Sequence, residues 1–144
     1  MKTSHLHDIW AAPDNDRLVS KQFSFRFPVH IAAKIAALAE IYPQKNRTQI
    51  VADLLTAALD DLEKNLPIKL YGADPEMQRM HDEYHHDHGL QTETVYEMGG
   101  TRAQYRKSCN KHYKALEKEL GNESAPNLYE SIFGSKDYLE NFKE

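Results

Sequence analysis

The chain has 144 residues and a formal net charge of −4 at neutral pH, with 40% hydrophobic and 28% charged residues. This composition is ordinary for a globular protein. A single cysteine, Cys109, excludes an internal disulfide framework and a cysteine-rich metal motif. No apolar run approaches the roughly 20 residues that a membrane span needs, and Met1 to Trp10 lacks the apolar core of a secretory signal. We therefore expect a cytoplasmic protein in a reducing compartment, with no membrane partner.

Charge is distributed unevenly along the chain. Residues 1–66 hold 8 Lys+Arg and 8 Asp+Glu, so they are neutral, whereas residues 67–144 hold the remaining 10 and 14 and carry the whole −4. After Pro67 the aliphatic residues thin out and tyrosines and charges increase. We therefore predict a first domain over residues 20–66 and an acidic, tyrosine-rich, helical second domain over 67–144.

Residues 1–19 are mixed in character and are expected to form an N-terminal arm or loop, with Ile9 and Trp10 as a docking point. Next, apolar and polar residues alternate strictly over residues 22–27, which predicts a half-buried β-strand. Pro28 ends this strand and suits the first turn of a helix.

Two helices are predicted after the strand. The first covers residues 29–42, because apolar side chains recur at helical spacing; they are Ile31, Ile35, Leu38 and Tyr42. Asn46, followed three residues later by Gln49, has the form of a capping box that begins a second helix running to about Lys64. The side chains expected to face inward from the second helix are Ile50, Val51, Leu54, Leu55, Ala58 and Leu62.

A single strand cannot form a sheet, and two short helices cannot cover both its edges and their own apolar faces. The simplest missing partner is a second copy of the chain, with the two strands pairing antiparallel about a two-fold axis. We therefore predict a homodimer. Its expected core consists of Phe23, Phe25, Phe27, Ile31, Ile35, Leu38, Ile50 and Leu54.

In such a ribbon the phenylalanines share one face, so Gln22, Ser24 and Arg26 share the other. A two-stranded ribbon fits the major groove of B-DNA, which is about 12 Å wide. Arginine can pair with guanine and glutamine with adenine, whereas serine is less selective. An alternating strand can also be an ordinary one whose polar face is simply solvated.

The stretch from Gln22 to Pro28, together with the apolar positions of the following helices, resembles the ribbon-helix-helix family of MetJ/Arc-type repressors. The resemblance implies a mainly α fold, in which one intermolecular antiparallel two-stranded ribbon and two helices per chain form the dimer, followed here by a helical C-terminal region. It also implies that Gln22, Ser24 and Arg26 contact bases.

The resemblance further implies that backbone amides at the start of the second helix hold a DNA phosphate, which carries over to Arg47 and Thr48 with Asn46 as the cap. A helix N-terminus has unpaired N–H groups and a partial positive charge, so it attracts anions in any fold. Lys21 and Lys45 would add positive charge beside this phosphate site. The turn at 43–45 departs from the family, which usually has glycine and a small polar residue there.

The C-terminal half is expected to be helical. Its predicted elements are helices from Asp74 to Gly89 and from Thr101 to Gly121, a helical turn at 92–98, and short helical pieces at 127–133 and 135–142. The residues expected on one face of the helix from Thr101 to Gly121 are Tyr105, Cys109, His112, Leu116 and Leu120.

His81, His85 and His88 would share one face of a helix, and imidazoles at this spacing can bind zinc, nickel or copper. A histidine-rich solvated face explains the same pattern, so we predict no metal and no other cofactor. No nucleophile is accompanied by a base at a recognisable spacing, so we do not expect an enzyme.

These patterns favour a DNA-binding regulator, in particular a repressor, located at the nucleoid. It would bind a double-stranded operator as a homodimer, or as a tetramer on DNA, while residues 67–144 bind a protein or a small molecule. One alternative is an antitoxin whose C-terminal half binds a toxin. Another is a protein-interaction module whose ribbon serves only to dimerise.

Overall fold

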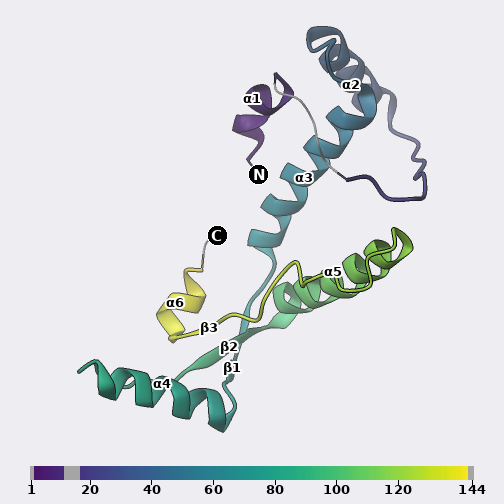
Figure 1. The fold of residues 1–144 in the computed structure, drawn as a ribbon. Coiled ribbons are helices and arrows are strands. Elements are labelled where there is room, and N and C mark those ends of the chain that lie inside the picture. The colour runs from purple at the N-terminus through teal and green to yellow at the C-terminus, as the bar shows by residue number, and fades with distance from the viewer. Residues whose placement is uncertain (1, 12–16, 143–144) are drawn as a thin grey trace. The chain divides into compact units, whose positions relative to one another are not determined.

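The computed structural model describes residues 2–11 and 17–142, which are mainly helical with one small sheet (Figure 1). The chain divides into two compact units, Met1–Asn65 (unit 1) and Leu66–Glu144 (unit 2). Within the described residues, no helix combines the length and the apolar character that crossing a membrane requires.

Unit 1 contains a 3-10 helix η1, Thr3–His5, followed by α1, Leu6–Trp10, α2, Val29–Ile41, and α3, Arg47–Asn65. The two helices predicted from apolar periodicity are therefore confirmed, each to within one residue at both ends. The four side chains expected on the inner face of α2 are all half-buried rather than buried.

The N-terminal segment differs from the expected arm or loop, because Thr3 to Trp10 is helical. Met1 and residues 12–16, which belong to the same prediction, lie outside the described residues. Leu6 and Trp10 form a buried cluster with Ile50 and Ala57 of α3. A five-residue helix has almost no stability of its own, so this tertiary contact is what holds α1 in place.

Polar contacts fix Trp10 in that cluster. Its indole Nε1 donates a hydrogen bond of 2.7 Å to the carboxylate of Asp53, and both side chains are buried. The Trp10 ring also meets the ring of Tyr42 edge-on, with centroids 5.1 Å apart. Asp53 lies one turn from Ile50 on α3, so α1 is held to a single face of that helix.

The start of α3 is a reciprocal capping box, as predicted. The Gln49 backbone N–H donates to Asn46 Oδ1 at 2.8 Å, and the Asn46 N–H donates to Gln49 Oε1 at 3.0 Å. A capping residue of this kind stabilises a helix by about 1 kcal/mol. These two hydrogen bonds therefore fix Asn46 as the residue that caps α3.

A second face of α3 remains exposed. Leu55, Ala58 and Leu62 were expected to face inward, but all three are exposed, and so is Leu59. The prediction was wrong for the single chain because α1 covers the face that carries Ile50, and α2 covers too little of the rest. Within the part of the chain described, this leaves an apolar stripe along α3.

Unit 2 has a three-stranded antiparallel sheet, which the sequence patterns did not indicate. Its strands are β1, Lys69–Gly72, β2, Tyr96–Gly99, and β3, Phe133–Gly134, in the order β1-β2-β3. The helices are α4, Pro75–Asp87, α5, Gly100–Glu119, and α6, Lys136–Glu140. The segment predicted as a helical turn, 92–98, is instead irregular over 92–95 and then enters β2, and the helical piece predicted at 127–133 is an irregular segment leading into β3.

Two predicted helix starts are confirmed by their caps. Asp74 Oδ1 accepts a hydrogen bond of 2.8 Å from the Met77 N–H at the start of α4, and Ser135 Oγ accepts from Tyr138 N–H at the start of α6. The end of α4 lies two residues before Gly89, whose φ of +68° suits glycine.

The start of α5 is different from the prediction. Thr101 was expected to cap this helix, but Gly99 is the capping residue and no side chain makes a cap hydrogen bond. Gly100 has φ +79°, and a Cβ there would lie 2.8 Å from the backbone nitrogen of Lys69. The tight passage from β2 into α5 thus requires glycine, which explains why the helix begins there.

The buried face of α5 was also predicted wrongly. Arg102, Arg106 and Glu117 are its buried residues, whereas His112 and Leu120, both expected inward, are exposed. The guanidinium groups of Arg102 and Arg106 lie over aromatic rings. These two side chains are therefore buried, although a prediction from hydrophobicity alone places arginines at the surface.

Candidate nucleic-acid interface

The segment predicted as a strand, residues 22–27, forms no strand in the single chain. It is an irregular stretch that leads through Pro28 directly into α2. Among the described residues the only sheet is that of unit 2, so this segment has no strand beside it. A strand is defined by hydrogen bonds to a neighbouring strand, and this segment has no such neighbour in the single chain. This accounts for the absence of the predicted strand.

The three phenylalanines of this segment lie at the surface. Phe23, Phe25 and Phe27 are 61%, 68% and 43% exposed. Monomeric proteins rarely expose several large apolar side chains close together in sequence. Such a group of exposed side chains commonly marks an interaction site.

The three side chains predicted to read bases, Gln22, Ser24 and Arg26, are all exposed on the same short segment. They alternate with the phenylalanines in sequence. If the segment pairs as a strand, the alternation separates an apolar face from a hydrogen-bonding face that carries one cation.

The residues predicted to contact a DNA phosphate differ in how far their side chains are exposed. Lys21, Asn46, Arg47 and Thr48 are exposed, but Lys45 is only 6% exposed. Lys45 ends the turn between α2 and α3, and its N–H donates to the carbonyl of Tyr42. The Lys45 side chain is therefore buried in the single chain, and its contact with a phosphate stays a prediction.

The N-terminus of α3 keeps the chemistry expected of an anion site. The first amides of an α-helix have no acceptor within the helix. Asn46 accepts from Gln49, and the amides of Arg47 and Thr48 precede it in the same turn. Both of these residues are exposed, and the Arg47 side chain adds a full positive charge to the partial charge of the helix end.

The residues predicted for the dimer core are found in three environments. Ile50 is fully buried, but by α1 of its own chain. Leu38 and Leu54 are half-buried at the edge of the same cluster. Ile31 and Ile35 are also half-buried, and the phenylalanines described above are exposed. Among the described residues of unit 1, apolar surface therefore remains exposed on residues 22–27 and on the α3 stripe, and half-exposed on one face of α2.

Of the three histidines considered as metal ligands, two contact each other and the third makes contacts elsewhere. The rings of His81 and His85 lie 3.8 Å apart, and His85 Nδ1 is 2.7 Å from the carbonyl of Gln91. His88 instead stacks on Tyr84 and bonds to its carbonyl oxygen. Over the described ranges, no three or more His, Cys, Asp or Glu side chains gather where they could hold a metal ion.

Two arrangements were missed by sequence reasoning, the buried Trp10–Asp53 hydrogen bond and a pocket beside α5 in unit 2. Each joins residues more than 25 positions apart, so no local spacing signals it. No family model matches the chain, and no curated protein or solved structure does so either.

Proposed function

We propose that the chain is a sequence-specific DNA-binding transcriptional regulator, in particular a repressor, which acts as a homodimer through a β-ribbon formed by residues 22–27 of two protomers. The observation that carries this proposal is the exposure of three alternating phenylalanines on a segment that has no regular secondary structure and no strand beside it. A capped helix pair, α2 and α3, follows that segment directly.

A second copy of the chain meets both needs of this segment. It supplies a strand for the unpaired backbone and an apolar surface for the phenylalanines. Burying a phenylalanine side chain contributes about 1.5–3 kcal/mol. Each protomer contributes three phenylalanines to this contact, together with the α3 stripe residues Leu55, Leu59 and Leu62. We expect this apolar surface to be enough to stabilise such a dimer.

Dimerisation also explains the polar residues. With the phenylalanines buried, Gln22, Ser24 and Arg26 of both protomers point outward as six hydrogen-bonding side chains in one ribbon. The α3 N-termini supply Arg47 and the first-turn amides to flanking phosphates. Unit 1 is neutral overall, which is compatible with DNA binding because only the contacting face must be positive.

Changing Arg26 to alanine is expected to reduce discrimination at one or two base pairs of each half-site, by about 1–3 kcal/mol per base contact. Affinity for non-specific DNA should change much less. The measurement is competition binding against operators substituted at single positions. Equal discrimination by wild type and Arg26→Ala would overturn the base-reading role.

Changing Arg47 to alanine is expected to act differently, because a phosphate contact is independent of sequence. Binding should weaken similarly for all DNA, and the slope of log affinity against log salt should become shallower by about 1 for each phosphate that is no longer neutralised. A salt titration of wild type, Arg26→Ala and Arg47→Ala on one operator distinguishes the two roles.

The experiment that tests the function as a whole is selection of bound duplexes from a random pool with the full chain. The proposal expects a two-fold symmetric site in which mutation of Arg26 removes the preference at one or two base pairs of each half-site. Recovery of no preferred sequence, with an intact dimer, would instead favour a protein-interaction module.

A further inference from the structure

The positive charge of unit 2 is concentrated in α5. Residues 67–144 hold 10 Lys+Arg and 14 Asp+Glu, but α5 alone holds six of these cations and only two of these carboxylates, which gives the helix a net charge of +4. Since residues 67–144 carry −4 in all, the remainder carries −8. A segment that is acidic on average therefore contains one strongly basic helix.

Four of these cations form a stripe along α5. They stand at i, i+4, i+7 and i+11, so they share one face of the helix, and all of them are exposed. They are Lys107, Lys111, Lys114 and Lys118 (the lysine stripe). At a rise of about 1.5 Å per residue the stripe is about 16 Å long. The two carboxylates of α5 lie off this face, because Glu117 is buried and Glu119 is turned about 100° from Lys118.

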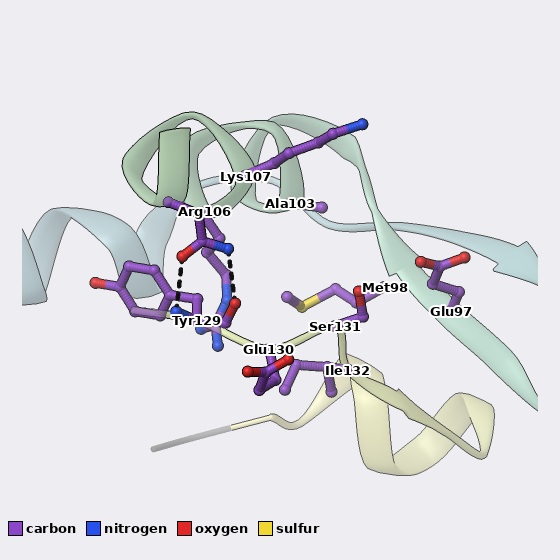
Figure 2. Close-up of a pocket in the computed structure, with 10 residues that line it drawn as sticks. Glu97, Met98, Ala103, Arg106, Lys107, Tyr129, Glu130, Ser131 and Ile132 are labelled. Carbon is purple, nitrogen blue, oxygen red and sulfur yellow. Dashed lines mark hydrogen bonds between the residues drawn. The ribbon is translucent and has the colours of Figure 1, made fainter. Parts of the chain in front are cut away.

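The segment that returns along α5 lies beside the stripe and does not cover it. The Asn110 side chain holds this segment, donating to the Tyr129 carbonyl at 2.7 Å and accepting from the Tyr129 N–H at 2.9 Å (dashed lines in Figure 2). Lys107 borders the pocket found there, which Glu97 and Glu130 also line. In Figure 2, however, the Lys107 side chain extends away from Tyr129 and Glu130. Within the described residues, none of the four ammonium groups forms an ion pair with a carboxylate.

The stripe has no evident benefit for the helix itself. Lys107 and Lys111, and likewise Lys114 and Lys118, are like charges at i, i+4, a spacing at which repulsion destabilises a helix. Solvated helix faces more often alternate the two signs of charge. Only Lys118 is in the last turn, where the helix dipole favours a cation. An anionic partner would remove the repulsion among all four.

A straight row of cations, one side chain wide, fits a linear row of anions such as the phosphates of a nucleic acid. A membrane-bound helix would need large apolar side chains next to its cations, but the exposed neighbours of the stripe are Gln104, Ser108 and Ala115. Glutamine and serine can also donate to phosphate oxygens. We propose that the lysine stripe binds the phosphate backbone of double-stranded DNA, as a sequence-independent contact in addition to that of unit 1. This inference rests on the proposed function, which supplies the duplex.

The test is binding of the full chain to a selected operator and to a non-specific duplex over a series of salt concentrations. Changing Lys111, Lys114 and Lys118 together to glutamine should weaken binding to both duplexes by the same factor, at least about tenfold at about 0.1 M salt. The slope of log affinity against log salt should become shallower by about 1 for each lysine that contacts a phosphate. Lys107 is kept because it also lines the pocket. Glutamine is a good helix former, so the variant should keep the circular dichroism of wild type.

A matched control removes three cations from other exposed positions of unit 2, with Lys69→Gln, Arg79→Gln and Lys136→Gln combined. This control should bind with the affinity and salt slope of wild type. Wild-type affinity and slope in the stripe variant, beside a reduced slope in Arg47→Ala, would overturn the stripe alone. A wild-type chain that prefers no sequence, but loses affinity when the stripe is changed, would support the stripe and overturn operator reading by unit 1. Stripe-dependent binding to vesicles of equimolar phosphatidylserine and phosphatidylcholine, with no binding to any duplex, would overturn the assignment to DNA.

Discussion

Replacing Trp10 by alanine is expected to lower the free energy of unfolding of unit 1 by about 3–5 kcal/mol, the usual cost of deleting a large buried aromatic side chain. Trp10 is 4% exposed, packs with Leu6, Ile50 and Ala57, and donates to Asp53. Since small domains are stable by only about 5–15 kcal/mol, this loss should be visible in urea unfolding followed by circular dichroism.

Two further variants separate the parts of that effect. Trp10→Phe keeps an aromatic ring but removes the N–H donor, so the buried Asp53 carboxylate loses its 2.7 Å hydrogen bond. The expected cost is about 1–3 kcal/mol from that bond alone. Tyr42→Phe, which removes the hydroxyl 2.7 Å from His7 Nδ1 at an exposed position, should cost much less. A stability for Trp10→Ala equal to that of wild type would mean that α1 is not docked on α3.

Replacing Phe25 by alanine is expected to dissociate the proposed dimer while leaving the protomer intact. Phe25 is 68% exposed in the single chain, so its removal takes little away from the isolated protomer. In the dimer the loss of about 3–5 kcal/mol occurs in both protomers, so the dimer dissociation constant should rise by roughly four orders of magnitude or more. Sedimentation velocity over a dilution series measures this change.

Leu128→Ala is the matched control for Phe25→Ala, because Leu128 is 52% exposed but lies in unit 2. It should leave the dimer dissociation constant unchanged. In the proposed complex the ribbon of two chains binds DNA, so operator affinity should fall with Phe25→Ala. A wild-type chain that sediments as a folded monomer at micromolar concentration would count against the shared ribbon.

The helices of unit 1 could be predicted because their signals are local. The spacing of Ile31, Ile35 and Leu38 repeats at the helical period, and the capping box of Asn46 and Gln49 lies within four residues. The cap at Asp74 was predictable for the same reason. Each of these features can be read from a few neighbouring residues, without knowledge of the rest of the fold.

The sheet of unit 2 could not be predicted in this way. β1 and β2 have four residues each and pair across an intervening helix, with Leu70 opposite Met98. Alternation over four residues is too short to distinguish a strand from a helical turn. The segment around Tyr129 looked helical, but its backbone is bonded to the Asn110 side chain, and nothing near Tyr129 in sequence indicates that partner.

The residues predicted to contact DNA differ in their exposure. Exposure of Arg26, Arg47 and Thr48 agrees with the requirements of DNA contact, but burial of Lys45 does not. The turn at 43–45 has its own hydrogen bonds, including one from Gln44 to the carbonyl of Trp10. A distant helix therefore influences this turn, and spacing within the turn cannot reveal it.

Trp10 has a consequence for spectroscopy as well, because it is the single tryptophan of the chain. It belongs to unit 1, whereas unit 2 contains tyrosines but no tryptophan. Excitation at the red edge of indole absorption therefore reports on the environment of one unit without a signal from the other. A red shift of that emission marks the release of α1, and comparison with the helical signal of the whole chain shows whether the two units unfold together or one before the other.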